Sequence, residues 1–139
     1  MDKIVFATTN AGKIKEIKEI LADFDVEVAS MKEMNITADI EENGATFEEN
    51  SLIKARAVSK LTGLPALADD SGLEVDYLNG EPGIYSARYL GRDTDYDYKN
   101  NYIIKKLKDA KDEERSARFV CVISLVLPDG REFVKKGVM

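Results

Sequence analysis

The sequence predicts an α/β protein with a mixed β-sheet flanked by helices. Strand-length apolar runs alternate along the 139 residues with segments whose apolar residues recur at helical spacing. Helices interleaved with strands favour parallel pairing, whereas the turn Pro128-Asp129-Gly130 near the end of the chain joins two strands that must run antiparallel. Because the chain shows no linker, repeat or low-complexity segment, a single domain over residues 1–139 is expected.

The first elements are expected to be a strand, a polar turn and a helix. Residues 3–8 have the apolar character of a buried strand, and residues 9–12 form a polar turn that contains a glycine. Residues 14–24 place isoleucine, leucine and phenylalanine at helical spacing between lysines and glutamates. A second strand is indicated around Val26 and Val28, where apolar and polar residues alternate.

The middle of the chain predicts a well-capped helix followed by a short strand. Thr46-Phe47-Glu48-Glu49 has the pattern of a capping box, which begins a helix. That helix is expected to run to Thr62, with Gly63 as its stop. The apolar residues 66–68 are expected to form a strand that ends at Asp69.

The second half of the chain predicts three further strands and one more helix. Residues 73–77 alternate like a strand, and residues 94–107 are a helix candidate with Thr94 as its N-cap. Residues 117–127 give the strongest strand signal, and residues 132–136 are expected to return as the hairpin partner.

Composition excludes several classes of function. The formal net charge of -6 argues against nonspecific nucleic-acid binding, but a metal ion and a few lysines can still neutralise a nucleotide's phosphates. Because the chain has no histidine, any general base must be a carboxylate, a lysine, a tyrosine or the lone thiol of Cys121. A single cysteine and the lack of a signal peptide or membrane span fit a cytoplasmic protein with no membrane partner.

Asp69-Asp70-Ser71-Gly72 is the most informative stretch. Two adjacent carboxylates at the end of an apolar strand are costly to desolvate, and a divalent cation such as Mg²⁺ is the commonest reason for such a pair. Ser71 and the glycine after it can bring a hydroxyl and bare backbone close to a phosphate substrate. The alternative interpretation is an aspartate-rich turn after a strand.

A candidate phosphate-binding turn lies between the first expected strand and the first expected helix. Backbone N–H groups and the positive end of the helix dipole favour an anion there. The spacing differs from the longer glycine-rich P-loop, so an ordinary turn with a solvated lysine is the alternative. The residues of this turn are Thr8, Thr9, Asn10, Ala11, Gly12 and Lys13.

A second acidic pair and one lysine complete the candidate groups. Glu41 or Glu42 can complete a metal site with Asp69 and Asp70, or both glutamates can simply complement the dipole of the helix that follows. Lys54 lies about two turns into that helix and could reach a phosphate, although an ordinary surface lysine is the alternative.

Four blocks, taken together, resemble the Ham1/RdgB family of noncanonical purine nucleoside triphosphate pyrophosphatases, also called inosine triphosphatases. The blocks are residues 8–13, 41–50, 69–76 and 82–89, and their order and spacing match along the whole chain. The last block also contains Arg88 and Tyr89, which suit either phosphates or a protein contact.

The resemblance implies Mg²⁺-dependent hydrolysis of XTP, ITP or dITP to the monophosphate and pyrophosphate by a cytosolic homodimer. It also implies the roles of individual residues. Asp70 would be the proton acceptor, and Glu41, Asp69 and Asp70 would bind the metal. The substrate would contact Thr8, Thr9, Asn10, Ala11, Gly12, Lys13, Lys54 and Ser71.

The resemblance further implies a C-terminally truncated inosine triphosphatase-like fold. Family members continue beyond Met139 with a Phe-Gly-Tyr/Trp-Asp-Pro block and a Ser-His-Arg block that recognise the purine, and neither maps onto this chain. Weaker base selectivity and lower turnover are therefore expected. The alternatives are a noncatalytic remnant that binds nucleotide phosphates or dimerises, and a different phosphohydrolase of related architecture.

Overall fold

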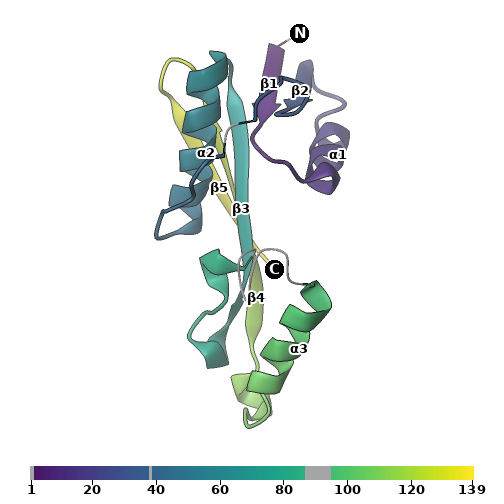
Figure 1. Cartoon of the computed structure of the whole chain (residues 1–139), viewed down its shortest axis with the longest axis vertical. Helices are drawn as coiled ribbons and strands as arrows, with labels where there is room; N and C mark the ends of the chain where they lie inside the picture. The colour runs from purple at the N-terminus through teal and green to yellow at the C-terminus, as the bar shows by residue number, and fades with distance from the viewer. Residues whose placement is uncertain (1, 38, 87–94) are drawn as a thin grey trace. The chain divides into compact units, whose positions relative to one another are not determined.

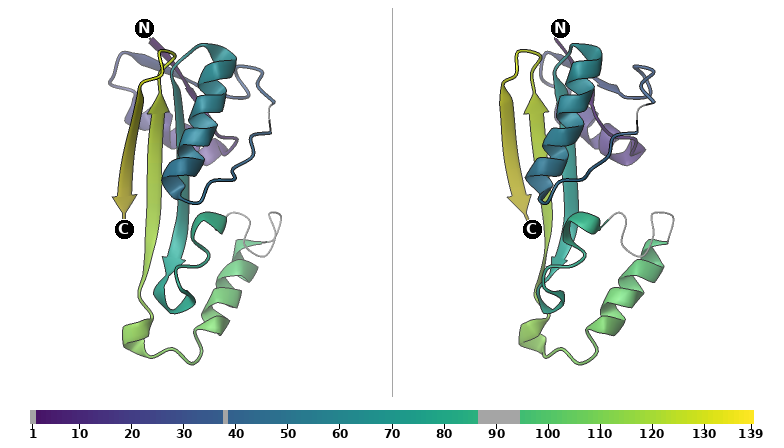
Figure 2. Two further views of the ribbon diagram at one scale, coloured as in Figure 1. Left: turned by 90° about the vertical axis from the view of Figure 1, so that its left-hand side faces the viewer. Right: turned by 60° about the vertical axis from the view of Figure 1, so that its left-hand side comes forward.

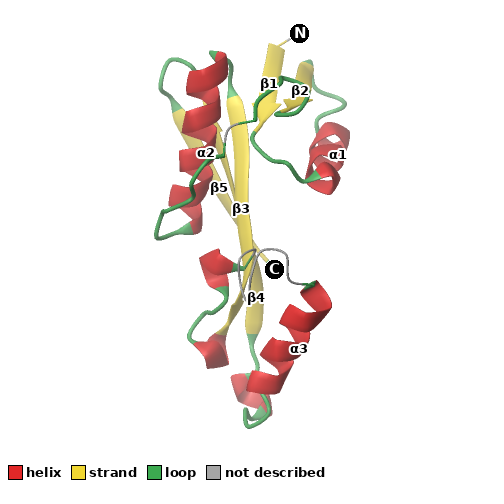
Figure 3. Cartoon of the chain, in the orientation of Figure 1, coloured by secondary structure: helices red, strands yellow, loops and turns green. Residues whose placement is uncertain are grey.

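The computed structural model describes residues 2–37, 39–86 and 95–139, and it contains one five-stranded sheet (Figures 1 and 3). The strands lie in the order β2-β1-β3-β4-β5. The helices and strands are β1 (Asp2–Phe6), α1 (Ala11–Ile20), β2 (Val26–Ser30), α2 (Phe47–Thr62), β3 (Ala66–Val75), α3 (Tyr96–Lys106), β4 (Ala117–Val126) and β5 (Glu132–Val138). Short 3₁₀ helices cover Asp76–Leu78, Gly83–Tyr85 and Asp112–Glu114.

The sheet is mixed, as predicted. Strand β1 pairs in parallel with β2 on one side and with β3 on the other. The β4–β5 hairpin is antiparallel, because Phe119 and Met139 exchange two backbone hydrogen bonds while Leu127 N–H donates to Arg131 O beside the turn. None of the helices in the described part of the chain has the length and apolar content needed to cross a membrane.

The chain divides into two compact units. The first contains the residues up to Asp70 together with residues 122–136, and the second contains residues 71–121 and 137–139. Strands β3 and β4 each contribute residues to both units. The single domain expected from the sequence therefore stays a prediction.

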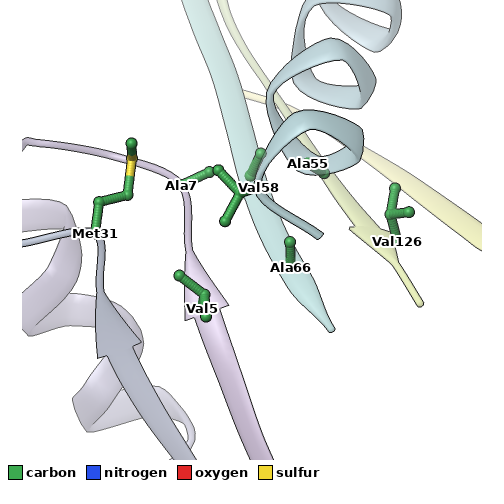
Figure 4. Close-up of a cluster of buried hydrophobic side chains, with 8 residues drawn as sticks. Val5, Ala7, Met31, Ala55, Val58, Ala66 and Val126 are labelled. Carbon is green, nitrogen blue, oxygen red and sulfur yellow. The ribbon is translucent and has the colours of Figure 1, made fainter. Parts of the chain in front are cut away.

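The core of the first unit joins α2 to the sheet. Small side chains at Ala55, Ala66 and Ala68 let the helix pack closely on the strands, and all three are fully buried. Figure 2 shows α2 running along the sheet beside β3, and Figure 4 shows the side chains between them. The buried cluster consists of Val5, Ala7, Met31, Ala55, Val58, Ala66, Ala68 and Val126.

Helix α2 begins and ends where the sequence predicted. The Thr46 hydroxyl accepts a hydrogen bond from Glu49 N–H at 3.1 Å, and the Glu49 carboxylate accepts one from Ala45 N–H at 2.7 Å. Gly63 ends the helix in the left-handed region at φ 68°, which costs glycine little. The capping glutamate thus reaches one residue further back than the predicted box.

The first helix is shorter than its apolar spacing predicted. Helix α1 ends at Ile20, and the residues Ile20 and Phe24 are exposed, at 65% and 63%. Since Asp2 pairs with Val26, the helix must return the chain to the start of β1. Ten helical residues span ~15 Å, close to the ~17 Å of a five-residue strand, so a longer helix would overshoot.

The placement of Asp69 at a strand end was wrong. Strand β3 continues without a break from Ala66 to Val75, so both aspartates lie inside it. The parallel pairing with β1 ends at the Phe6–Leu67 register pair, whereas β4 still neighbours β3 on the other side. The acids therefore follow the end of β1's pairing, and β4 keeps the strand extended.

Helix α3 begins at Tyr96, with Asp95 as its N-cap. The Asp95 carboxylate accepts a hydrogen bond from Asp97 N–H at 2.6 Å. The predicted cap, Thr94, lies outside the described residues, as do Arg88 and Tyr89.

Candidate active site

The turn between β1 and α1 is shaped by its own side chains. Asn10 is the N-cap of α1, and its Oδ1 accepts a hydrogen bond from Lys13 N–H at 3.1 Å. Asn10 N–H in turn donates to Thr8 Oγ1 at 3.2 Å. These contacts preform the turn, and the first N–H groups of a helix point out of its N-terminus. Anion binding by residues 8–13 stays a prediction, because the N–H groups of Asn10 and Lys13 already donate within the turn.

Lys13 brings this turn to the aspartate pair. Its Nζ forms an ion pair with Asp69 Oδ2 at 2.8 Å across 56 positions of sequence. The Lys13 side chain keeps 37% of its surface exposed, whereas the Asp69 side chain keeps 7%. A partly exposed cation thus compensates a buried carboxylate at the edge of the first unit.

Both aspartates are buried and short of hydrogen bonds. Asp69 Oδ1 and Asp70 Oδ2 are buried oxygens with no hydrogen-bond partner among the described residues. The pKa of Asp70 is raised from 3.8 to about 6, mainly by burial and in smaller part by the charges of Glu42 and Asp69. Lys54 and the Asn50 amide act in the opposite direction. A buried carboxylate without donors is unfavourable unless a cation or another ligand completes it.

Lys54 connects α2 to the acidic loop and to β3. Its Nζ forms an ion pair with Glu42 Oε1 at 3.0 Å and donates to the backbone carbonyl of Asp69. The Lys54 side chain is only 15% exposed, so it is no ordinary surface lysine. The structure thus brings Lys54 to the backbone of Asp69, and its contact with a phosphate stays a prediction.

The two glutamates before α2 differ in position. Glu42 is half-buried and held by Lys54, whereas Glu41 is exposed. Within the described part of the chain, no group of three or more acidic or cysteine side chains is placed to hold a metal ion. The predicted ligand set of Glu41, Asp69 and Asp70 therefore stays a prediction.

Ser71 follows Asp70 in β3 and belongs to the second unit. In that unit Ser86 has a structural role: its Oγ accepts a hydrogen bond from Leu73 N–H at 3.0 Å and donates one to Gly83 O at 2.6 Å. This part of the fourth sequence block therefore braces its own loop against β3.

Asn50 is a residue of this site that the sequence reasoning missed. It is fully buried in α2, its Oδ1 accepts a hydrogen bond from Gly44 N–H at 2.8 Å, and its Nδ2 has no partner. A signal existed, because position 50 falls on the helix face that also buries Phe47 and Val58. A polar amide on a core-facing stripe needs a partner or a role.

Comparison with known proteins agrees with this arrangement. The model of the Ham1 family matches residues 4–139. The dITP/XTP pyrophosphatase of Clostridium perfringens is 48% identical over 143 residues, which cover 99% of this chain and 70% of that protein. A dITP/XTP pyrophosphatase of Thermus thermophilus is 51% identical over 135 residues, covering 97% of this chain and 64% of that protein. The chain thus spans about two thirds of the length of these relatives.

Solved structures give the same result. The Ham1 protein of Coxiella burnetii superposes with a TM-score of 0.91 at 41% identity, over 99% of this chain and 71% of that one. The Ham1 protein of Staphylococcus aureus gives a TM-score of 0.89 at 43% identity, over 99% of this chain and 70% of that one. These matches confirm the predicted fold class and the predicted resemblance. The chain belongs to the Ham1 family.

Proposed function

We propose that this site hydrolyses noncanonical purine nucleoside triphosphates such as dITP, XTP and ITP to the monophosphate and pyrophosphate. Relatives that share about half of its residues are dITP/XTP pyrophosphatases. The observation that carries the proposal is the buried pair Asp69 and Asp70, with two unpartnered oxygens beside two lysines from different helices. Phosphoryl-group hydrolysis needs this combination of negative ligands and positive phosphate contacts.

The aspartate pair fits a divalent cation such as Mg²⁺. Asp69 Oδ1 and Asp70 Oδ2 are hard oxygens without donors, and Mg²⁺ is commonly bound by one or two carboxylates plus substrate phosphates. Asp69 and Asp70 would hold the ion, with Glu41 as the proposed third carboxylate. When bound, the ion would neutralise phosphate charge and lower the pKa of coordinated water.

Asp70 suits the role of proton acceptor. A carboxylate whose pKa is about 6 is ionised at neutral pH yet more basic than an ordinary aspartate. In the proposed step, the oxygen of water bonds to phosphorus and the phosphorus–oxygen bond to pyrophosphate breaks. The proton of the water passes to the Asp70 carboxylate.

The turn and the two lysines are proposed to hold the triphosphate. Lys13 and Lys54 contact aspartate and glutamate oxygens, and phosphate oxygens offer the same chemistry. Backbone N–H groups of residues 8–13 would add uncharged donors. Ser71 is proposed as a further substrate contact on the basis of the family resemblance.

We also infer a homodimer in the cytoplasm, because the sequence resembles a family of cytosolic homodimers. The net charge of -6 disfavours nucleic acid as a partner. Light scattering of the purified chain tests the dimer, and a monomeric mass at micromolar concentration would contradict it.

The activity is tested by measuring pyrophosphate release from ITP, XTP, dITP, GTP and dTTP in Mg²⁺. We expect release from the first three at a higher kcat/KM than from GTP or dTTP. No release from any nucleotide would favour a noncatalytic phosphate-binding remnant. Release mainly from GTP or dTTP would favour a different phosphohydrolase.

A further inference from the structure

The acidic loop, residues 39–45, precedes helix α2 and belongs to the first unit. From residue 40 to residue 45, every second residue is half-buried, and the residues between them are exposed. The half-buried residues are Ile40, Glu42 and Gly44. A period of two residues is that of an extended backbone, whose successive side chains point to opposite sides. One side of the loop therefore faces the protein, and Glu41 lies on the other side.

Each half-buried residue of the loop has a contact of its own. Ile40 packs against the buried core cluster of the first unit. Glu42 Oε1 pairs with Lys54 Nζ at 3.0 Å, and Gly44 N–H donates to Asn50 Oδ1 at 2.8 Å. Since Asn50 and Lys54 are four residues apart in α2, they lie on one face of the helix. The loop therefore runs along this face, antiparallel to the helix.

Glu49 adds a contact that an ordinary capping box lacks. In such a box the glutamate accepts a hydrogen bond from the backbone N–H of the N-cap residue, which here is Thr46. Glu49 Oε2 instead accepts from Ala45 N–H at 2.7 Å, inside the loop. Consecutive N–H groups of the loop, at Gly44 and Ala45, are thus bound by consecutive side chains of the helix, at Asn50 and Glu49.

The close approach of loop and helix requires glycine at position 44. A Cβ at Gly44 would lie 2.7 Å from Asn50 Oδ1, 2.7 Å from Glu49 Cβ and 3.2 Å from Asn50 N. The Cβ and the backbone nitrogen are fixed by the helix and cannot turn aside as the end of a side chain can. Any other residue would therefore push the loop away from the first turn of α2.

We propose that Glu49 and Gly44 are positioning residues, which clamp the acidic loop onto the first turn of α2 and thereby hold Glu42 against Lys54. The catalytic consequence rests on the proposed function, in which Lys54 contacts the triphosphate. Lys54 Nζ also donates to the backbone carbonyl of Asp69, so an oxygen from the loop and an oxygen from β3 fix its position. Without the clamp, Lys54 would lose the first of these oxygens.

The first test removes the clamp at an exposed side chain. Glu49→Ala should raise KM for ITP about three- to tenfold and leave kcat within about twofold, because Lys54 is displaced but not lost. Glu49→Gln keeps an oxygen that accepts from Ala45 N–H, so KM should return to the wild-type value. Glu48→Ala is the matched control, since Glu48 lies in the same first turn but the hydrogen bond to the loop comes from Glu49. An unchanged KM in Glu49→Ala, or an equal rise in Glu48→Ala, would overturn the proposal.

The second test asks whether the clamp acts through Glu42. In a chain that already carries Glu42→Gln, Glu49→Ala should raise KM by less than about twofold, whereas independent, multiplicative effects would overturn the proposal. Gly44→Ala should raise KM as Glu49→Ala does. Its control is Gly137→Ala, whose added Cβ would lie 3.9 Å from Cys121 O, an ordinary contact. A wild-type KM in Gly44→Ala would equally count against the clamp.

The third test needs no turnover. The N–H groups of Gly44 and Ala45 both donate to side chains of α2, so both amides should exchange slowly with deuterium in the wild type. In Glu49→Ala, the amide of Ala45 should exchange at least about tenfold faster. This acceleration in a chain that releases no pyrophosphate would support the clamp and refute the proposed function. Fast exchange of both amides in the wild type would overturn the clamp, whatever the activity.

Discussion

Strand β3 leads from one pair of acids to another, and the two pairs differ in almost every physical respect. Asp69 and Asp70 are buried in the first unit, and each has an oxygen without a hydrogen bond. Glu74 and Asp76, in the second unit, are more exposed, and both form ion pairs with Arg118, at 3.1 and 2.7 Å. Asp76 also accepts a hydrogen bond from the Ser116 hydroxyl.

The pKa shifts of Asp70 and Asp76, one acid from each pair, run in opposite directions. Burial raises the pKa of Asp70 to about 6, whereas the Ser116 hydroxyl and then Arg118 lower the pKa of Asp76. Acids that are paired with an arginine contribute to the fold, whereas buried acids with unpartnered oxygens are candidates for binding a ligand. The difference therefore identifies the first pair as the candidate site and the second as structural.

Asp70→Asn should give the largest effect, lowering the activity and raising the stability of the folded protein. Turnover of ITP should fall ~10³-fold or more, because the proposed proton acceptor and a metal ligand are lost together. The raised pKa means that ionisation of Asp70 destabilises the folded protein, so wild-type stability falls as pH rises from about 4 through about 6.

The stability half of this prediction is measured by urea unfolding without metal or nucleotide. The variant should be more stable than the wild type at about pH 8, by up to ~3 kcal/mol, and the difference should shrink towards about pH 4. Unchanged turnover would remove Asp70 from the mechanism. A variant less stable than the wild type at every pH would show that ionisation of Asp70 does not destabilise the folded protein.

Lys13→Ala should give the second-largest effect, and that effect should be on nucleotide affinity. We expect affinity for a triphosphate to fall about tenfold or more while affinity for the nucleoside is unchanged, because a charged hydrogen bond to phosphate is lost. Calorimetry with ITP and inosine measures both. Lys18→Ala is the control, since Lys18 lies on the same helix but pairs with the exposed Glu33 at 2.7 Å. Equal losses for both ligands would mean that Lys13 shapes the fold.

Exchanging Glu41 and Glu42 for glutamine, one at a time, should show which of the two binds the metal. If Glu41 is the third metal ligand, Glu41→Gln should raise the Mg²⁺ concentration for half-maximal turnover about tenfold. Glu42→Gln should instead raise KM for ITP, because its ion pair with Lys54 at 3.0 Å is lost. Metal titrations of both variants measure this, and the reverse pattern would assign the metal to Glu42.

Local chemistry made much of this architecture predictable. The cap at Thr46, the stop at Gly63 and the alternation of strands and helices depend on near neighbours in sequence, and the structure confirms them. The sequence assigned the turn at residues 8–13 and the two aspartates to one site, and the Lys13–Asp69 ion pair joins them. The role of the turn in phosphate binding stays a prediction.

The remaining features depend on pairing over long distances. Nothing near Asp69 indicates that β4 keeps β3 extended through the acids, so a strand end was the wrong expectation. The partner of Lys54 depends on how the loop before α2 folds back, which placed Glu42 rather than Glu41 beside it. Asn50 differs, since its place on the buried stripe was readable, but the orientation of its amide required Gly44 in space.

Asp76→Asn should have the smallest effect on stability and on turnover. A small effect is what the difference between the two acid pairs predicts. Because the pKa of Asp76 is lowered in the folded protein, its contribution to stability is present above the ordinary aspartate pKa and is lost as pH falls through the lowered value. The substitution should lower the unfolding midpoint slightly at neutral pH, and the difference from wild type should shrink in acid and in high salt, since exposed pairs are weak and screened.

Thermal unfolding across pH and salt measures this, alongside ITP turnover, which should stay at the wild-type value. A loss of turnover comparable to that of Asp70→Asn would break the comparison, because it would show that an exposed and fully satisfied acid takes part in the chemistry.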